Sequence, residues 1–142
     1  MTVRLLTMLV GALGLAGNAH FDGQVWDPDD MGTFSIIARD PATGKLGMGV
    51  QSRAFAAGNR AMTIKGGGVV IAHQASANPI SDAIGLELLS AGMDPQQALE
   101  FMLRSDEGRA NRQVAILDAQ GRTAAWTGTG ANDCKGHTCG TN

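Results

Sequence analysis

The sequence predicts an α+β domain in which antiparallel strands carry a layer of helices. Short apolar runs bounded by turn residues recur over residues 33–76 and again over 113–127, which is typical of strands and hairpins. Two stretches between them, at 81–91 and 95–105, show the apolar spacing of amphipathic helices. Antiparallel strands followed by a helical hairpin favour helices layered on a sheet.

The composition fits one globular domain and argues against two classes of partner. A chain of 142 residues with 44% hydrophobic and 17% charged residues can form a core and is not typical of a disordered protein. The net charge is −2 and no long basic run occurs, so neither nucleic acid nor an anionic membrane is indicated. Aromatic residues make up only 4%, which further weakens a base-stacking surface.

The first 19 residues are expected to be a secretory signal peptide. Met1 to Arg4 gives a short positive start, Leu5 to Gly17 is apolar, and small residues precede a cut after Ala19. The alternative is a buried N-terminal helix, which the three glycines of this segment disfavour. The prediction is therefore a secreted or periplasmic protein that has no membrane contact after the signal is removed.

Residues 20–32 are polar and acidic, without a sustained period, and are interpreted as a linker or propeptide. A second interpretation is that translation starts at Met31. In either case the ordered domain is expected to cover residues 33–142.

Four strands are expected first, over residues 33–39, 45–52, 61–65 and 69–76. Residues 40–44, Asp-Pro-Ala-Thr-Gly, supply the turn between the first two. Residues 53–59 are expected to form a loop.

Two helices and a late hairpin complete the predicted order. The first helix, 81–91, ends at Gly92, and the second starts with Asp94 as N-cap and Pro95 at the first helical position. Strands at 113–118 and 122–127 form the late hairpin, and the tail from Gly128 is rich in glycine, threonine and cysteine.

Thr33 is the candidate nucleophile. It follows Gly32 directly and precedes an apolar run. A cut between Gly32 and Thr33 gives one residue both a hydroxyl and a free α-amine, which together form a nucleophile with its own base. The alternative is that Thr33 only opens a strand, since β-branched residues favour strands.

Four stretches together resemble one family: Thr33–Pro41, Val50–Asn59, Gly85–Leu89 and Arg112–Asp118. The chain resembles the family known as domain of unknown function 1028, within the N-terminal nucleophile (Ntn) hydrolase superfamily. The resemblance implies a four-layer αββα sandwich of two antiparallel sheets. It also implies hydrolysis of an amide bond by an N-terminal residue, here Thr33, with no cofactor and no metal. The substrate would be a small-molecule or peptide amide.

Further residues are expected to line such a site. Ser52 and Arg53 end the second strand, and Arg53 is either a fork-shaped contact for a substrate carboxylate or a solvated surface arginine. Asn78 is either a donor to the developing oxyanion or an ordinary turn starter before Pro79. His73 stands in an apolar strand and is interpreted as a core residue and not a catalyst.

The C-terminal tail holds the remaining chemically active residues. Cys134 and Cys139 are candidates for a local disulfide in an exported protein, while a metal site that adds His137 has only three ligands. Gly136-His137 resembles a late Gly-His stretch of the family, so His137 is a candidate for lining the site. The domain is expected to be truncated at Asn142, which would leave apolar faces uncovered and favour association into homo-oligomers.

Two functions remain open at this point. The first is an exported Ntn hydrolase with Thr33 as its nucleophile. The second is a non-catalytic ligand-binding or assembly domain with the same fold. A signal-peptide cut after Ala19 leaves 13 residues in front of Thr33, so the first hypothesis requires a second cut.

Overall fold

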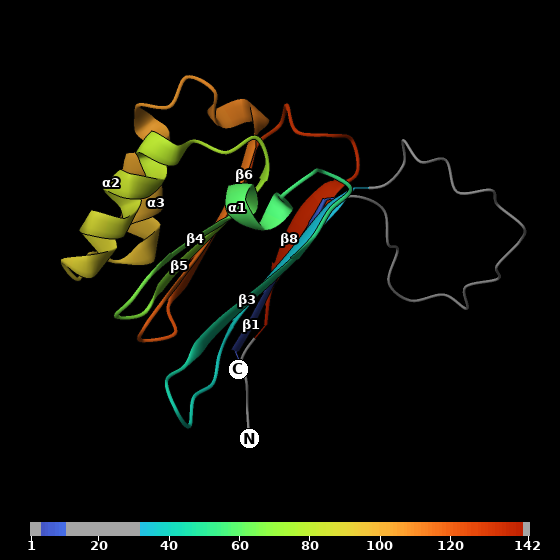
Figure 1. The fold of residues 1–142 in the computed structure, drawn as a ribbon. Helices are drawn as coiled ribbons and strands as arrows, with labels where there is room; N and C mark the ends of the chain where they lie inside the picture. The colour runs from blue at the N-terminus through green and yellow to red at the C-terminus, as the bar shows by residue number, and fades with distance from the viewer. Residues whose placement is uncertain (1–3, 11–31, 141–142) are drawn as a thin grey trace, which may run out of the picture.

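The computed structural model describes residues 4–10 and 32–140 and confirms the predicted α+β class. Two four-stranded antiparallel sheets pack face to face, and two helices cover the outer face of one of them (Figure 1). Sheet A has the strand order β3-β2-β1-β8, and sheet B has the order β4-β5-β6-β7.

Sheet A contains the predicted first hairpin. Its strands are β1 Arg4–Val10, β2 Thr33–Arg39, β3 Leu46–Gln51 and β8 Lys135–Cys139. The turn between β2 and β3 forms because Asp40 accepts hydrogen bonds from the Ala42 N–H at 2.9 Å and from the Thr43 hydroxyl at 2.6 Å. Gly44 then adopts a φ of 72°, which glycine reaches without steric cost.

Strand β1 lies within the segment predicted as a signal peptide. Its backbone pairs with β2 on one side, where Val10 faces Thr33, and with β8 on the other, where Val10 faces Lys135. The structure thus places residues 4–10 as an inner strand of sheet A. Removal of the signal peptide stays a prediction. The predicted linker lies outside the described residues except for Gly32.

Sheet B contains the other predicted strands. They are β4 Met62–Lys65, β5 Val69–Ala75, β6 Arg112–Asp118 and β7 Thr123–Thr127, each antiparallel to its neighbour. Gly67 and Gly68 turn the chain between β4 and β5 with φ near 100°, at 102° and 104°. The glycine run therefore forms the turn that the sequence predicts.

The helix α3, Pro95–Arg104, starts at Pro95 as its cap predicts, whereas α2, Pro79–Ser90, starts two residues before the expected residue 81. The Asn78 side chain accepts a hydrogen bond from the Ser81 N–H at 3.3 Å, and Asp94 accepts one from the Gln96 N–H at 2.9 Å. Each cap therefore satisfies a backbone donor that the first helical turn would leave unpaired.

One sequence expectation was wrong, and one strand was not predicted. Residues 53–59, expected as a loop, lead into the short helix α1, Ala57–Ala61, which contacts β3, β4 and β5 at the end of the sheets. The tail from Gly128, for which the sequence predicted no element, contributes β8 to sheet A. Neither segment has an apolar periodicity from which its structure could be predicted. Tertiary contacts determine both structures.

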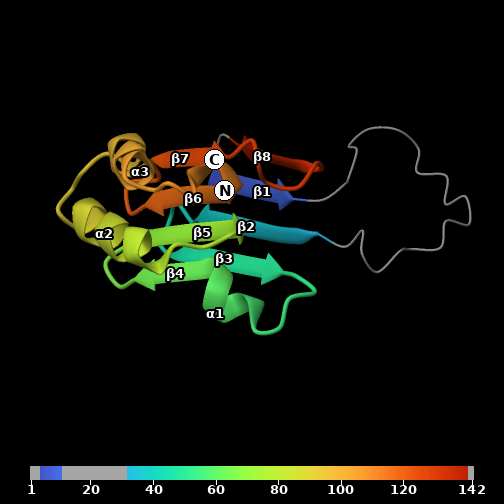
Figure 2. The same ribbon diagram turned by 90° about the horizontal axis from the view of Figure 1, so that it is seen from above.

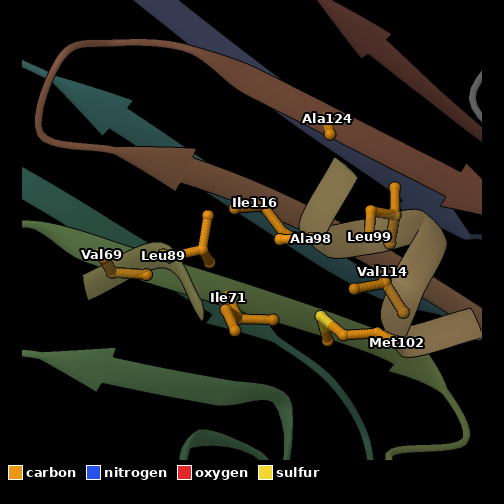
Figure 3. Close-up of a cluster of buried hydrophobic side chains, with 9 residues drawn as sticks. All are labelled: Val69, Ile71, Leu89, Ala98, Leu99, Met102, Val114, Ile116 and Ala124. Atoms are coloured by element: carbon orange, nitrogen blue, oxygen red, sulfur yellow. The ribbon is translucent and has the colours of Figure 1, made fainter. Parts of the chain in front are cut away.

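Side chains alternate on β5 and β6, so these strands supply two cores. One face carries Ile71 and Ile116, which pack against α2 and α3, where Leu99 of α3 joins the same core (Figure 3). The other face packs against sheet A through Val70, Leu117 and Ile37 of β2. The described part of the chain therefore has three layers, helices, sheet B and sheet A, which Figure 2 shows from above.

Candidate functional site

A pocket of about 140 Å³ opens where the two sheets and α1 meet. Sheet A contributes Thr33, the first residue of β2, and Ser52 follows the end of β3. Sheet B contributes the end of β5. The full lining is Thr33, Ser52, Ala54, Ala57, Arg60, Ala61, His73, Gln74, Ala75 and Ala77. Segments that are far apart in the sequence thus meet at this end of the sheets.

The Thr33 hydroxyl is held by a second hydroxyl in the pocket. Thr33 Oγ1 lies 2.9 Å from Ser52 Oγ, and both residues are half-buried. Ser52 Oγ also accepts a hydrogen bond from the Ala54 N–H at 3.0 Å. Because a hydroxyl has one donor and two acceptor positions, Ser52 Oγ can either donate to Thr33 Oγ1 or accept from it. The structure brings together the predicted nucleophile and one predicted lining residue.

Gln74 places a buried amide in the same pocket. Its Nε2 donates a hydrogen bond to Ser35 Oγ on β2, which ties the two sheets together. Gln74 is only 3% exposed, and its buried Oε1 has no hydrogen-bond partner among the described residues. A buried acceptor left without a donor costs about 1–3 kcal/mol, so this oxygen favours a ligand that carries an N–H or O–H group.

His73 faces the other side of sheet B, because neighbours on a strand point in opposite directions. Its Nε2 lies 2.6 Å from Asp82 Oδ1 on α2, and Asp82 Oδ2 accepts a hydrogen bond from the Thr63 hydroxyl at 3.2 Å. The His73–Asp82 contact is short, but its atoms are not aligned as in a hydrogen bond. This position in the core agrees with the interpretation of His73 as a core residue.

The backbone beside the pocket is strained at two positions. Ala56 and Ala75 have φ of 55° and 63°, and among the described residues they are the two non-glycine residues with positive φ. Ala75 lines the pocket and Ala56 precedes the lining residue Ala57. Such conformations cost about 1–3 kcal/mol each and cluster at functional sites, where the surrounding structure holds them in place.

Arg112 holds the pocket wall that follows Ala75. Its Nη1 donates hydrogen bonds to Ser76 Oγ and to the Ala77 carbonyl, both at 3.0 Å. Its Nε and Nη2 bind the two carboxylate oxygens of Asp106, with the Nη2 contact at 2.9 Å. These hydrogen bonds from Arg112 are the main reason why the pKa of Asp106 is lowered below 3.8. The same pair raises the pKa of Arg112.

Comparison with known proteins identifies the family. The model of a "Family of unknown function (DUF1028)" matches residues 33–142, which is most of the chain. This chain belongs to that family. The match begins at Thr33. The family that the sequence motifs indicated is therefore confirmed.

A solved structure supports the fold of this DUF1028 chain. The crystal structure of protein SPO2555 from Silicibacter pomeroyi, which carries the same family name, resembles it with a TM-score of 0.56 at 24% identity. The similarity covers 94% of this chain and 47% of SPO2555, so the chain spans about half the length of that protein. No curated protein matches the sequence.

Three predicted site residues are not among those that line the pocket of this DUF1028 chain. Asn78 caps α2 and hydrogen-bonds Asp106, which contributes to the low pKa of that carboxyl. Arg53 lies between two lining residues without being one. His137 is exposed on β8, with its Nδ1 at 2.8 Å from Thr127 Oγ1. Thr127 Oγ1 in turn accepts a hydrogen bond from Gln113 Nε2 at 2.9 Å, so His137 belongs to a polar network between β6, β7 and β8.

Sequence reasoning predicted only Thr33 and Ser52 of the ten lining residues, and among those that it missed are the polar residues Arg60 and Gln74. Arg60 lies in α1, which the sequence did not predict. Gln74 carried one signal, since it is a polar residue in the apolar run Val69–Ala75. A buried amide requires hydrogen-bond partners, and here the partner, Ser35, lies in the other sheet.

The candidate disulfide does not form in this structure. Cys134 and Cys139 are both free and exposed. Cys134 directly precedes β8 and Cys139 is its last residue, and five residues of extended chain span about 16 Å, well beyond the roughly 7 Å limit between the Cα atoms of a disulfide. Within the described residues no group of three His, Cys, Asp or Glu side chains could hold a metal ion. In this same part of the chain no helix is long and apolar enough to cross a membrane.

Proposed function

We propose that this DUF1028 chain is an exported Ntn hydrolase that cleaves an amide bond through Thr33 once the Gly32–Thr33 bond has been cut. The observation that carries the proposal is the position of Thr33. It opens β2, its hydroxyl lies in the pocket against Ser52, and the family match starts at the same residue.

The chemistry follows from the two groups that Thr33 would carry after the cut. Its hydroxyl attacks the carbonyl carbon of the substrate amide, and its α-amine takes the hydroxyl proton. An α-amine has a pKa of about 8, so a substantial fraction is unprotonated near neutral pH. The protonated amine then donates to the departing nitrogen, and water hydrolyses the acyl-enzyme ester.

The proposal includes the four-layer αββα sandwich of this superfamily. Two facing antiparallel sheets with α2 and α3 on the outer face of sheet B are the arrangement that three of those layers would have. The fourth would be helices on the outer face of sheet A. The whole activity is proposed for a chain that spans about half the length of its structural relative SPO2555.

The test combines processing with activity. The full chain is expressed with its leader, and N-terminal sequencing and intact mass establish whether the mature protein begins at Thr33. Release of 4-nitroaniline from a panel of acyl 4-nitroanilides then measures activity. We expect Thr33→Ala to lower kcat/KM by at least about 10³-fold, as loss of a nucleophile does. Thr138→Ala, an exposed threonine of β8, serves as the matched control and should change neither reading.

Two outcomes would contradict the proposal. One is a mature chain that retains residues before Thr33 and still hydrolyses the amides. The other is activity that survives Thr33→Ala.

The alternative, a ligand-binding or assembly domain without catalysis, is favoured by one observation. In the intact chain the nitrogen of Thr33 is part of a peptide bond, and Thr33 pairs with Val10 of β1. If intact mass shows no cut at Gly32 and Thr33→Ala binds the same small molecules as the parent protein, this function replaces the first.

A further inference from the structure

The pocket contains a positive charge that no described acid neutralises. Arg60 lines it from α1, and none of the ion pairs among the described residues includes Arg60. The acids of the neighbouring helix α2 have other partners. Asp82 contacts His73 and Thr63, and Glu87 forms an ion pair with Lys65 at 2.6 Å. A guanidinium is suited to binding a carboxylate through two parallel hydrogen bonds.

Gln74 supplies a second recognition group. Its Oε1 is a buried acceptor without a partner among the described residues, and Ser35 holds the amide from its nitrogen side. Gln74 lines the pocket, and because this contact holds the amide nitrogen, Oε1 is the atom of the amide that remains without a donor among the described residues. It is suited to the N–H of an amide, and an ester of the same shape offers it no proton.

Size and lining limit the ligand further. The pocket of about 140 Å³ lies well below the roughly 300–1,000 Å³ typical of sites for drug-sized ligands. Five of its ten lining residues are alanines and the other five are polar, so small apolar side chains alternate with polar groups around a small volume. A short, unbranched acyl group fits such walls better than a large side chain.

We propose that the substrate is a small amide whose acyl part ends in a carboxylate, with Arg60 binding that carboxylate and Gln74 Oε1 accepting the amide N–H. This substrate class rests on the proposed function of Thr33. The C–N bond of the amide breaks and an ester forms between the acyl carbon and Thr33 Oγ1. The hydroxyl proton passes through the α-amine to the leaving amine, and water then releases a dicarboxylic acid.

The first test compares two chromogenic amides on the full-length protein as it is produced. Glutaryl 4-nitroanilide carries the carboxylate, and valeryl 4-nitroanilide has a methyl group in its place. We expect at least a tenfold higher kcat/KM for the glutaryl compound. Arg60→Gln should reduce this ratio to about one by raising KM for the glutaryl compound only, and Arg60→Lys should restore part of it. Arg104→Gln, an exposed arginine at the end of α3, is the control and should leave the ratio unchanged.

A second test does not depend on catalysis. Calorimetry measures binding of the mono-N-methylamide of glutaric acid to the Thr33→Ala protein. We expect binding that weakens at least tenfold when Arg60→Gln is added. Glutaric acid monomethyl ester should bind more weakly than the amide, and Gln74→Met should remove that difference.

The outcomes separate the two proposals. If the amide binds through Arg60 but no 4-nitroanilide is hydrolysed, the nucleophile proposal fails and the pocket specificity stands. Equal activity on both anilides, or equal losses in Arg60→Gln and Arg104→Gln, would overturn the proposed substrate class. Failure of the N-methylamide to bind the Thr33→Ala protein would overturn it as well.

Discussion

The two halves of strand β5 have opposite characters, although both are buried. Val69 to Ala72 are apolar and fill the two cores on either side of sheet B. His73 and Gln74 follow at once, 2% and 3% exposed, and their polar atoms face α2 and sheet A respectively. Strand β6 repeats the contrast, since Ile116 pairs with Ile71 while Gln113 pairs with Gln74.

The difference separates what stabilises the fold from what forms the pocket. The apolar half buries side chains that contribute about 1.5–3 kcal/mol each. The polar half and the facing part of β6 contain buried oxygens on Gln74 and Gln113 that have no partner among the described residues, and the backbone at Ala75 is strained, all of which reduce stability. Such features persist where a site needs them and other parts of the fold compensate.

The apolar half offers the largest expected effect. Ile116→Ala removes a fully buried side chain between sheet B and α3 and should lower the free energy of unfolding by about 4 kcal/mol. Denaturant unfolding measures it. The matched control is Ile64→Ala on β4, where the side chain is 60% exposed, and it should change stability by less than about 1 kcal/mol. Similar losses in both variants would mean that the apolar half is not the main source of stability.

Asp106 should show the next largest effect, because its pair with Arg112 fixes the wall at the polar end. Asp106→Asn removes the carboxylate from the half-buried Arg112 guanidinium and should cost about 2 kcal/mol at pH 7. Arg112 lowers the pKa of Asp106 below 3.8, so the contribution of the carboxylate is present above about pH 4 and is lost as the pH falls below that value. Unfolding curves of both proteins from pH 7 to pH 3 should therefore converge at the acid end. A difference in the free energy of unfolding between the two proteins that stays constant from pH 7 to pH 3 would show that the Asp106–Arg112 pair does not cause it.

Substitution of Gln74 should have a smaller effect on stability, because two opposing contributions offset each other. Gln74→Met removes the unpaired oxygen and keeps the length of the side chain, at the expense of the hydrogen bond to Ser35. We expect the free energy of unfolding to stay within about 1 kcal/mol of the parent. Thermal unfolding measures this, and a loss above about 3 kcal/mol would show that the polar half stabilises the fold after all.

The cysteines should show the smallest effect. Since both thiols are free, Cys134→Ser and Cys139→Ser should each change stability by less than about 0.5 kcal/mol, whereas loss of a disulfide would cost about 2–5 kcal/mol. Burial raises the pKa of the Cys139 thiol, so its alkylation by iodoacetamide should rise at a higher pH than that of an unperturbed thiol. Mass spectrometry of the alkylated protein measures both sites, and a mass that shows no alkylation without reductant would contradict the free state.

Local signals in the sequence were sufficient to predict most elements and two of the polar residues that line the pocket, Thr33 and Ser52. The turn at Asp40, the cap of α3 and the hairpin of β6 and β7 all depend on neighbouring residues, so they could be predicted. Thr33 and Ser52 could be placed together because one hairpin carries both.

Arg60, Gln74 and β8 could not be placed in the same way. Arg60 reaches the pocket through a five-residue helix that tertiary contacts determine. Gln74 requires knowledge that β5 faces β2, which comes from the packing of the two sheets and not from either strand alone. Strand β8 depends on a partner that is more than 120 residues away in the sequence.

The central position of β1 has a consequence for what a cut at Gly32 would produce. Residues 4–10 are joined to β2 only through the segment that ends at Gly32, and they pair with β2 and β8 on both sides. A single peptide-bond cleavage would turn sheet A from one chain into a complex of two. Its pairing would lose the high effective concentration of a tethered strand and become subject to dilution. The melting temperature of a protein processed in this way would then rise with its concentration, whereas that of the uncut chain would not.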